Sequence, residues 1–167
     1  MSNPESLMEF IEKAYLPSDD IKQKNNKAYA ELCFYVLSNL RNTPFVDDKN
    51  NINEIALNNY IKQLQILGKA RHITEVVNIV IGELLGNYAE TEEYPPVQIC
   101  DIIENINCKY INDGFKTRIL NKRGVTIRSA FDGGIMEFDE VAKYKKYADK
   151  VRFTHPVVCE IFDEISN

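Results

Sequence analysis

The sequence predicts an all-α protein, an irregular bundle of about eight helices, with stacked helix pairs as the alternative arrangement. Apolar residues recur along most of the chain at the three- and four-residue spacing of amphipathic helices. Only seven glycines and six prolines occur among 167 residues, which leaves little for the tight turns of a β protein. The one strand-like segment, residues 125–131, has no evident partner strand, so we expect an extended loop. The length fits a single domain over residues 1–167.

The first helix is expected over Pro4–Tyr15. Asn3 offers a capping side chain, Pro4 suits the first helical position, and Glu5 favours the positive end of the helix dipole. The residues expected on its apolar face are Leu7, Met8, Ile11 and Ala14. The Leu16-Pro17 pair is expected to end the helix.

Residues 27–40 (KAYAELCFYVLSNL) predict a second helix that is apolar on nearly every side. Such a helix normally lies at the centre of a fold, so we expect a buried, central element. Pro44 disfavours helical geometry at the residue before it, which sets the end near Arg41–Thr43. The polar loop that follows, residues 45–53, contains aspartates and asparagines but lacks the glycine and the terminal glutamate of an EF-hand. We expect a solvated turn and a helix cap there, and no metal site.

Four helices are expected in the middle of the chain, over residues 52–70, residues 73–88, a segment that begins at Pro95-Pro96, and residues 108–120. The second of these is rich in β-branched residues, but its length and spacing favour a helix over a strand. Gly114 inside the last one indicates a close approach to a neighbouring helix, or a break.

Two helices complete the chain. The first spans Ile135–Val151, with Phe138, Val141, Tyr144, Ala148 and Val151 expected to face inward. Its acidic residues precede its lysines, which is the order that the helix dipole favours. The last helix begins at Thr154-His155-Pro156, where His155 is expected to be a cap.

Composition and charge exclude several classes of protein. No apolar run approaches the roughly 18 residues that cross a bilayer, and the N-terminus lacks the pattern of a secretory signal, so we expect a cytoplasmic protein with no membrane partner. Residues 1–106 carry nine Lys and Arg against sixteen Asp and Glu, which argues against a general nucleic-acid binder. The four cysteines form no CxxC pair and the two histidines lie far from any zinc-binding spacing, so we expect buried reduced thiols, no metal and no cofactor.

The glycine-containing segment 114–134 is the most distinctive part of the sequence. Between Phe115 and Ala130 it carries five basic and no acidic residues. Three interpretations stay open. The basic residues brace helix ends; they contact a partner protein; or the basic loop 116–128 binds phosphate or nucleic acid, helped by backbone N–H groups at a helix start. The candidate binding residues are Lys122, Arg123, Arg128, Gly133 and Gly134. Acidic residues at 137–140 count against the third interpretation, because they occupy the place of the phosphate.

Scattered residues resemble a C-terminal helical region of large uncharacterised bacterial proteins. They are Phe45-Val46-Asp47, Ile81-Gly82 with Leu84-Leu85, Pro95-Pro96-Val97, Asn121–Val125, Arg128, Asp132–Gly134, Tyr144 and Pro156. The similarity spans roughly residues 28–165. The chain departs from it at Tyr94, where the family has Trp, and at 136–138, where the family has Gln-Glu-Arg. The resemblance implies no activity; it implies a helical module of a longer bacterial protein.

The chain contains none of the motifs GxSxG, GxxxxGKS, GxGxxG or HExxH, and two histidines at helix starts are a poor supply for nucleophilic catalysis. We therefore expect no enzyme. The sequence favours a non-catalytic helical module that contacts a protein partner or another part of a longer chain, and it leaves the oligomeric state open. The alternative is phosphate or nucleic-acid binding through loop 116–128.

Overall fold

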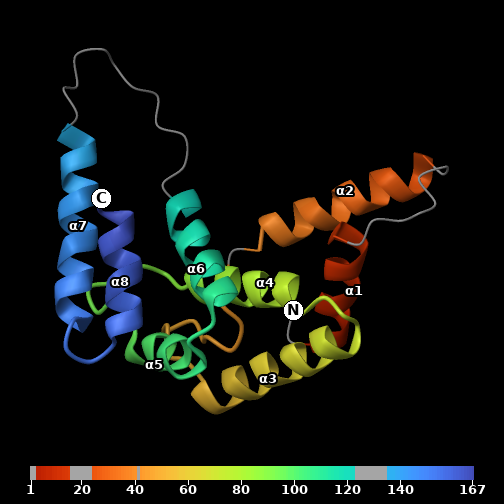
Figure 1. The fold of residues 1–167 in the computed structure, drawn as a ribbon, viewed down its shortest axis with the longest axis horizontal. Coiled ribbons are helices and arrows are strands. Elements are labelled where there is room, and N and C mark those ends of the chain that lie inside the picture. The colour runs from red at the N-terminus through yellow and green to blue at the C-terminus, as the bar shows by residue number, and fades with distance from the viewer. Residues whose placement is uncertain (1–2, 16–23, 41, 123–134) are drawn as a thin grey trace.

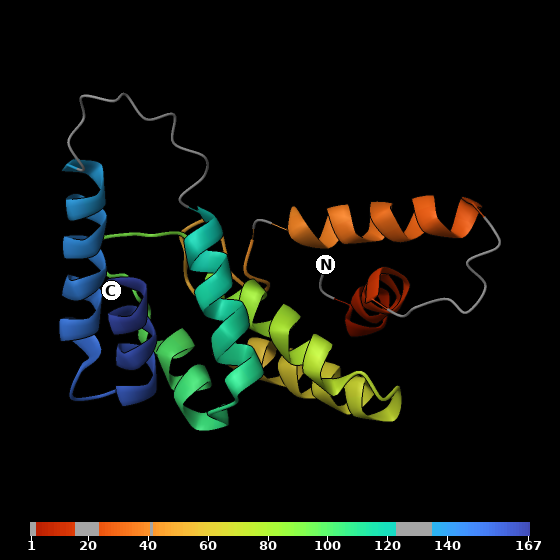
Figure 2. The ribbon, with the colours of Figure 1, turned by 45° about the horizontal axis from the view of Figure 1, so that its top comes forward.

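The computed structural model describes residues 3–15, 24–40, 42–122 and 135–167. Within these ranges the protein is all-α, as predicted (Figures 1 and 2). The helices are α1 (Pro4–Tyr15), α2 (Lys24–Ser38), α3 (Glu54–Ala70), α4 (Thr74–Gly86), α5 (Val97–Ile106), α6 (Lys109–Lys122), α7 (Ile135–Val151) and α8 (Pro156–Ile165). One isolated β-bridge, between Val46 and Ile52, is the sole β pairing in the part of the chain that is described. The helices cross at varied angles, so the bundle is irregular.

Capping residues fix the helix starts that the sequence predicted. The backbone N–H of Glu5 donates to Asn3 Oδ1 at 3.0 Å at the start of α1. Asn53 caps α3 by accepting from the N–H of Ala56 at 3.1 Å, so the polar loop 45–53 serves as a turn and a cap. The candidate cap His155 occupies the N-cap position of α8, but its side chain makes no capping hydrogen bond.

The most extensive contact between helices joins α4 and α6, which cross at the centre of the molecule (Figure 1). Glycines allow the two backbones to touch. A Cβ placed on Gly82 would lie 2.1 Å from the carbonyl oxygen of Ile111, and one placed on Gly114 would lie 2.1 Å from that of Ile79. The predicted close approach at Gly114 is therefore confirmed, and α6 runs through it without a break.

Helices α5, α7 and α8 pack together at one end of the molecule (Figure 1). His155 Nε2 lies 2.9 Å from Asp101 Oδ1, and Glu104 accepts from the N–H of Val157, so two side chains of α5 hold the start of α8. The core at this end is aromatic, with Tyr144 stacked on Phe162 at a centroid distance of 6.3 Å. Apolar side chains from all eight described helices form one continuous core.

The expectation that residues 27–40 form a buried central helix is wrong. Helix α2 packs across α1, its one extensive helix contact within the described residues, and extends away from the rest of the molecule (Figures 1 and 2). Among the α2 side chains that the structure describes, only Cys33 and Leu37 are buried. The pattern does predict a helix, but its apolar surface exceeds what α1 covers. Phe138 of α7, expected to face inward, is also exposed.

The prediction of buried thiols is confirmed for three of the four cysteines. Cys33, Cys100 and Cys159 are buried, Cys108 is half-buried, and all four thiols are free. No cluster of potential metal ligands occurs among the described residues. Within those residues, no helix is both long enough and apolar enough to cross a bilayer.

Candidate functional site

Of the five predicted site residues, the structure describes Lys122 alone. Arg123, Arg128, Gly133 and Gly134 lie outside the described residues, as does the expected loop 125–131. The candidate site is therefore built around Lys122, the last residue of α6, and the side chains that the fold brings to it.

Lys116 and Arg118, which precede Lys122 on α6, contact other parts of the chain. Lys116 Nζ pairs with Glu164 of α8 at 2.7 Å. Arg118 donates from Nη1 to the carbonyl oxygen of Ser38 at 3.1 Å, and from Nη2 to that of Leu40. Its Nε donates to Asn87 Oδ1. Arg118 thus supplies a cation at the negative end of α2. Lys116 and Arg118 therefore fit the interpretation in which the basic residues brace helix ends.

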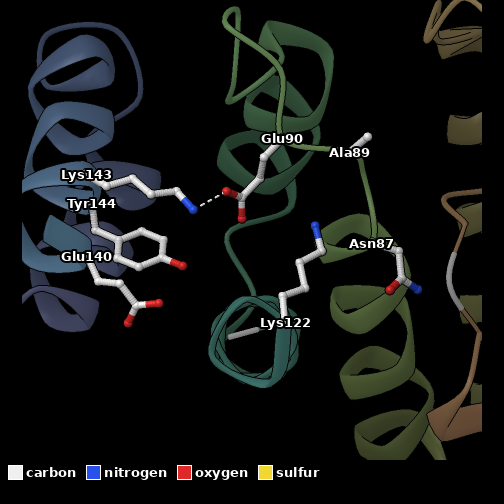
Figure 3. A pocket seen from close by; sticks show the side chains of 7 residues that line it. All are labelled: Asn87, Ala89, Glu90, Lys122, Glu140, Lys143 and Tyr144. Atoms are coloured by element: carbon white, nitrogen blue, oxygen red, sulfur yellow. Dashed lines mark ion pairs between the residues drawn. The ribbon is translucent and has the colours of Figure 1, made fainter. Parts of the chain in front are cut away.

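Lys122 lines a pocket of about 520 Å³ between the end of α6, the start of the α4–α5 connector and α7 (Figure 3). The connector contributes Asn87, Ala89 and Glu90, and α7 contributes Glu140, Lys143 and Tyr144. Figure 3 shows Lys122 and Lys143 reaching toward Glu90 from different helices. Two ammonium groups and two carboxylates therefore share one concave, polar site.

The ammonium group of Lys122 donates to the carbonyl oxygen of Tyr88 at 2.5 Å and lies 5.9 Å from the centre of the Tyr94 ring. Both contacts are to uncharged groups. Although much of the side chain is exposed, burial of its charged end lowers the pKa of Lys122, and the neighbouring cations Arg118 and Lys143 lower it further. Glu90 acts in the opposite direction. The protonated form of Lys122 is thus poorly compensated.

Lys143 has a different environment. It forms an ion pair with Glu90 and lies 5.2 Å from the centre of the Tyr144 ring. Although burial opposes the charge, the hydrogen bond and the ion pair with Glu90 leave the pKa of Lys143 raised overall. The two lysines of the pocket therefore differ: one has a carboxylate partner and the other has a carbonyl oxygen.

Sequence reasoning missed Glu90, Lys143 and Tyr144 as site residues. The lysines of α7 had a sufficient local explanation in the helix dipole, and Glu90 belongs to an acidic connector that resembles any solvated loop. The fold brings these positions to Lys122, because the connector passes between the end of α6 and α7 (Figure 3).

A second candidate lies on α2, where exposed apolar side chains gather. The exposed fractions are 52% for Tyr29, 54% for Leu32 and 65% for Tyr35. With the exposed Ala28, these residues form what we call the α2 stripe. Phe34, on another side of the helix, makes an edge contact with Tyr15 of α1 at 5.8 Å. The other large apolar side chains that the structure describes as exposed are spread over α1, α3, α5, α6, α7 and the α7–α8 turn.

The chain matches no protein-family model, no curated protein and no solved structure. The resemblance to the C-terminal region of large bacterial proteins therefore stays a prediction.

Proposed function

We propose that this protein is a non-catalytic association module that pairs with a second copy of the same chain through the α2 stripe. One observation carries the proposal: α2 presents Tyr29, Leu32 and Tyr35 to solvent. The helix packs across α1 and extends away from the core (Figure 2). Clustered exposed apolar side chains on a folded domain mark association surfaces.

The spacing of the stripe suits another helix. Ala28, Leu32 and Tyr35 follow intervals of four and three residues, which is the seam spacing of helices that pack side by side. Aromatic side chains are enriched at the centres of protein interfaces, and tyrosine supplies both apolar area and a polar tip.

The charge pattern favours a second copy over a charged partner. The charged side chains described on α2 are Lys27 and Glu31, which lie 3.9 Å apart and offset each other. A two-fold interface brings the same patch from both molecules together, so a charged patch would repel itself. The apolar stripe complements itself without such a penalty.

The size of the stripe sets the expected strength. Large aromatic side chains bury about 150–250 Å² each, so the half-exposed stripe offers on the order of 300–400 Å² per copy. A standard interface buries about 800 Å² per partner. With neighbouring parts of α1 and α2 included, we expect a weak dimer with a Kd in the micromolar range or above.

Sedimentation equilibrium over a wide range of protein concentration tests the proposal. The wild-type chain should show a reversible monomer–dimer equilibrium. The double variant Leu32→Glu/Tyr35→Glu should weaken the dimer by roughly a hundredfold or more, because central aromatic and aliphatic anchors carry most of an interface's energy.

Ile66→Glu is the matched control, since Ile66 of α3 is as exposed as Tyr35 but lies outside the stripe. It should dimerise like the wild type. A wild-type chain that stays monomeric at millimolar concentration, or a control that loses the dimer as the double variant does, would overturn the proposal.

A further inference from the structure

We infer that the pocket around Lys122 binds a small oxyanion, a carboxylate or a phosphate group, at the ammonium group of Lys122. This inference is independent of the α2 stripe, because the pocket lies between α6, α7 and the connector (Figure 3). Its volume of about 520 Å³ falls within the range of small-molecule sites.

Lys122 supplies the charge that such a ligand would meet. Its one hydrogen bond among the described residues goes to the neutral carbonyl oxygen of Tyr88, at 2.5 Å. No described carboxylate lies within 4.0 Å of its ammonium nitrogen. An ammonium group has three N–H donors, so two remain for a ligand. A bound oxyanion would relieve the desolvation and the repulsion that this cation experiences.

Glu90 offsets only part of the lowering of the Lys122 pKa, and its carboxylate is paired with Lys143. Lys143 also has three N–H donors, and one ion pair with Glu90 does not use all of them. The Lys143–Glu90 pair thus presents a further N–H without adding much net charge. Asn87 lines the connector wall of the pocket, and its amide oxygen accepts from Arg118 Nε.

The experiment is a titration of the full chain, at low ionic strength, with two probes: inorganic phosphate and acetate. Binding is followed by the NMR resonances of the pocket residues. We expect saturable shifts confined to Asn87–Glu90, Lys122 and the 140–144 segment. Shifts with phosphate alone would identify a phosphate site, and shifts with both probes would identify a general oxyanion site; either outcome supports the inference.

Lys122→Gln should weaken binding by roughly tenfold or more, the loss expected when a charge-assisted hydrogen bond is removed. Lys116→Gln is the matched control, since Lys116 lies on the same helix and pairs with Glu164 away from the pocket. It should leave the affinity unchanged. Lys122 also donates a hydrogen bond to Tyr88 in the α4–α5 connector, so its substitution can change the stability of the fold. The melting temperature of each variant is therefore measured as well.

Lys122→Gln should keep a wild-type fold, since Gln can still donate to the carbonyl oxygen of Tyr88. If it unfolds, Lys143→Gln provides the same test from the opposite wall. The inference is overturned if neither probe gives saturable shifts, or if Lys116→Gln weakens binding as much as the pocket variants do. The second result would indicate unspecific attraction of anions to exposed lysines and not a defined site.

Discussion

Glu83 of α4 is a half-buried carboxylate that the fold does not fully compensate. Burial raises the pKa of Glu83 above its usual 4.5, and the nearby guanidinium of Arg118 offsets only part of that shift. The folded state therefore holds a proton on Glu83 to higher pH than the unfolded state does. The unfolding free energy should fall as the pH rises from 4.5 through the folded-state pKa, and stay lower above it.

Glu83→Gln removes this ionisation, so it should raise the melting temperature at pH 7 by roughly 1–3 °C. The difference from the wild type should vanish near pH 4, where Glu83 is protonated in both states. Thermal unfolding followed by circular dichroism at several pH values measures both. Glu9→Gln, at an exposed position on α1, should have little effect; a Glu83→Gln variant that is less stable than the wild type at pH 7 would contradict the argument.

At the scale of elements, the crossing of α4 and α6 sets the arrangement of the bundle. Gly82→Ala and Gly114→Ala would each place a methyl group against a backbone carbonyl of the opposite helix. Each should lower the unfolding free energy by about 2–3 kcal/mol, as overpacking of a core does, despite alanine's higher helix propensity. Urea denaturation measures the loss.

Gly68→Ala is the matched comparison for these variants. Its Cβ would approach the side chain of Val77 at 3.0 Å, and a side chain can move more easily than a backbone. The loss should therefore be clearly smaller than at the α4–α6 crossing. If Gly82→Ala and Gly114→Ala stabilise the protein, the two helices do not touch as described.

Local rules account for most of the elements. Helices α1 and α7 have the bounds that the sequence predicted, because caps, dipole-favoured charges and apolar spacing act within one segment. Helix α2 shows that such local rules do not determine which face of a helix is buried. A helix that is apolar on most sides is equally suited to a buried position and to an association surface, and only the tertiary packing distinguishes Cys33, which is buried, from Tyr35, which is exposed.

The candidate pocket shows the same limit. Lys122 is recognisable from the basic segment, but its position beside Glu90 and Lys143 depends on how α6, α7 and the connector meet. No spacing rule along the chain relates positions 90, 122 and 143. Functional sites that are assembled from separate elements need the fold before their members can be named.

At the scale of the whole molecule, the net charge of −5 separates the two proposals. Two copies with the same net charge repel each other at low salt, while the α2 stripe itself is uncharged. Added salt screens that repulsion, so dimerisation should strengthen or stay constant between about 20 and 300 mM salt. Oxyanion binding at Lys122 should weaken over the same range, because a charge pair is screened.

The most direct test of the central claim is an isotope-filtered NOE measurement on an equimolar mixture of ¹³C-labelled and unlabelled chains, at a concentration where the dimer is populated. The α2 stripe predicts intermolecular contacts between the methyl groups of Leu32 in one copy and the rings of Tyr29 or Tyr35 in the other. Intermolecular contacts that arise only from other helices, with none from α2, would contradict the account.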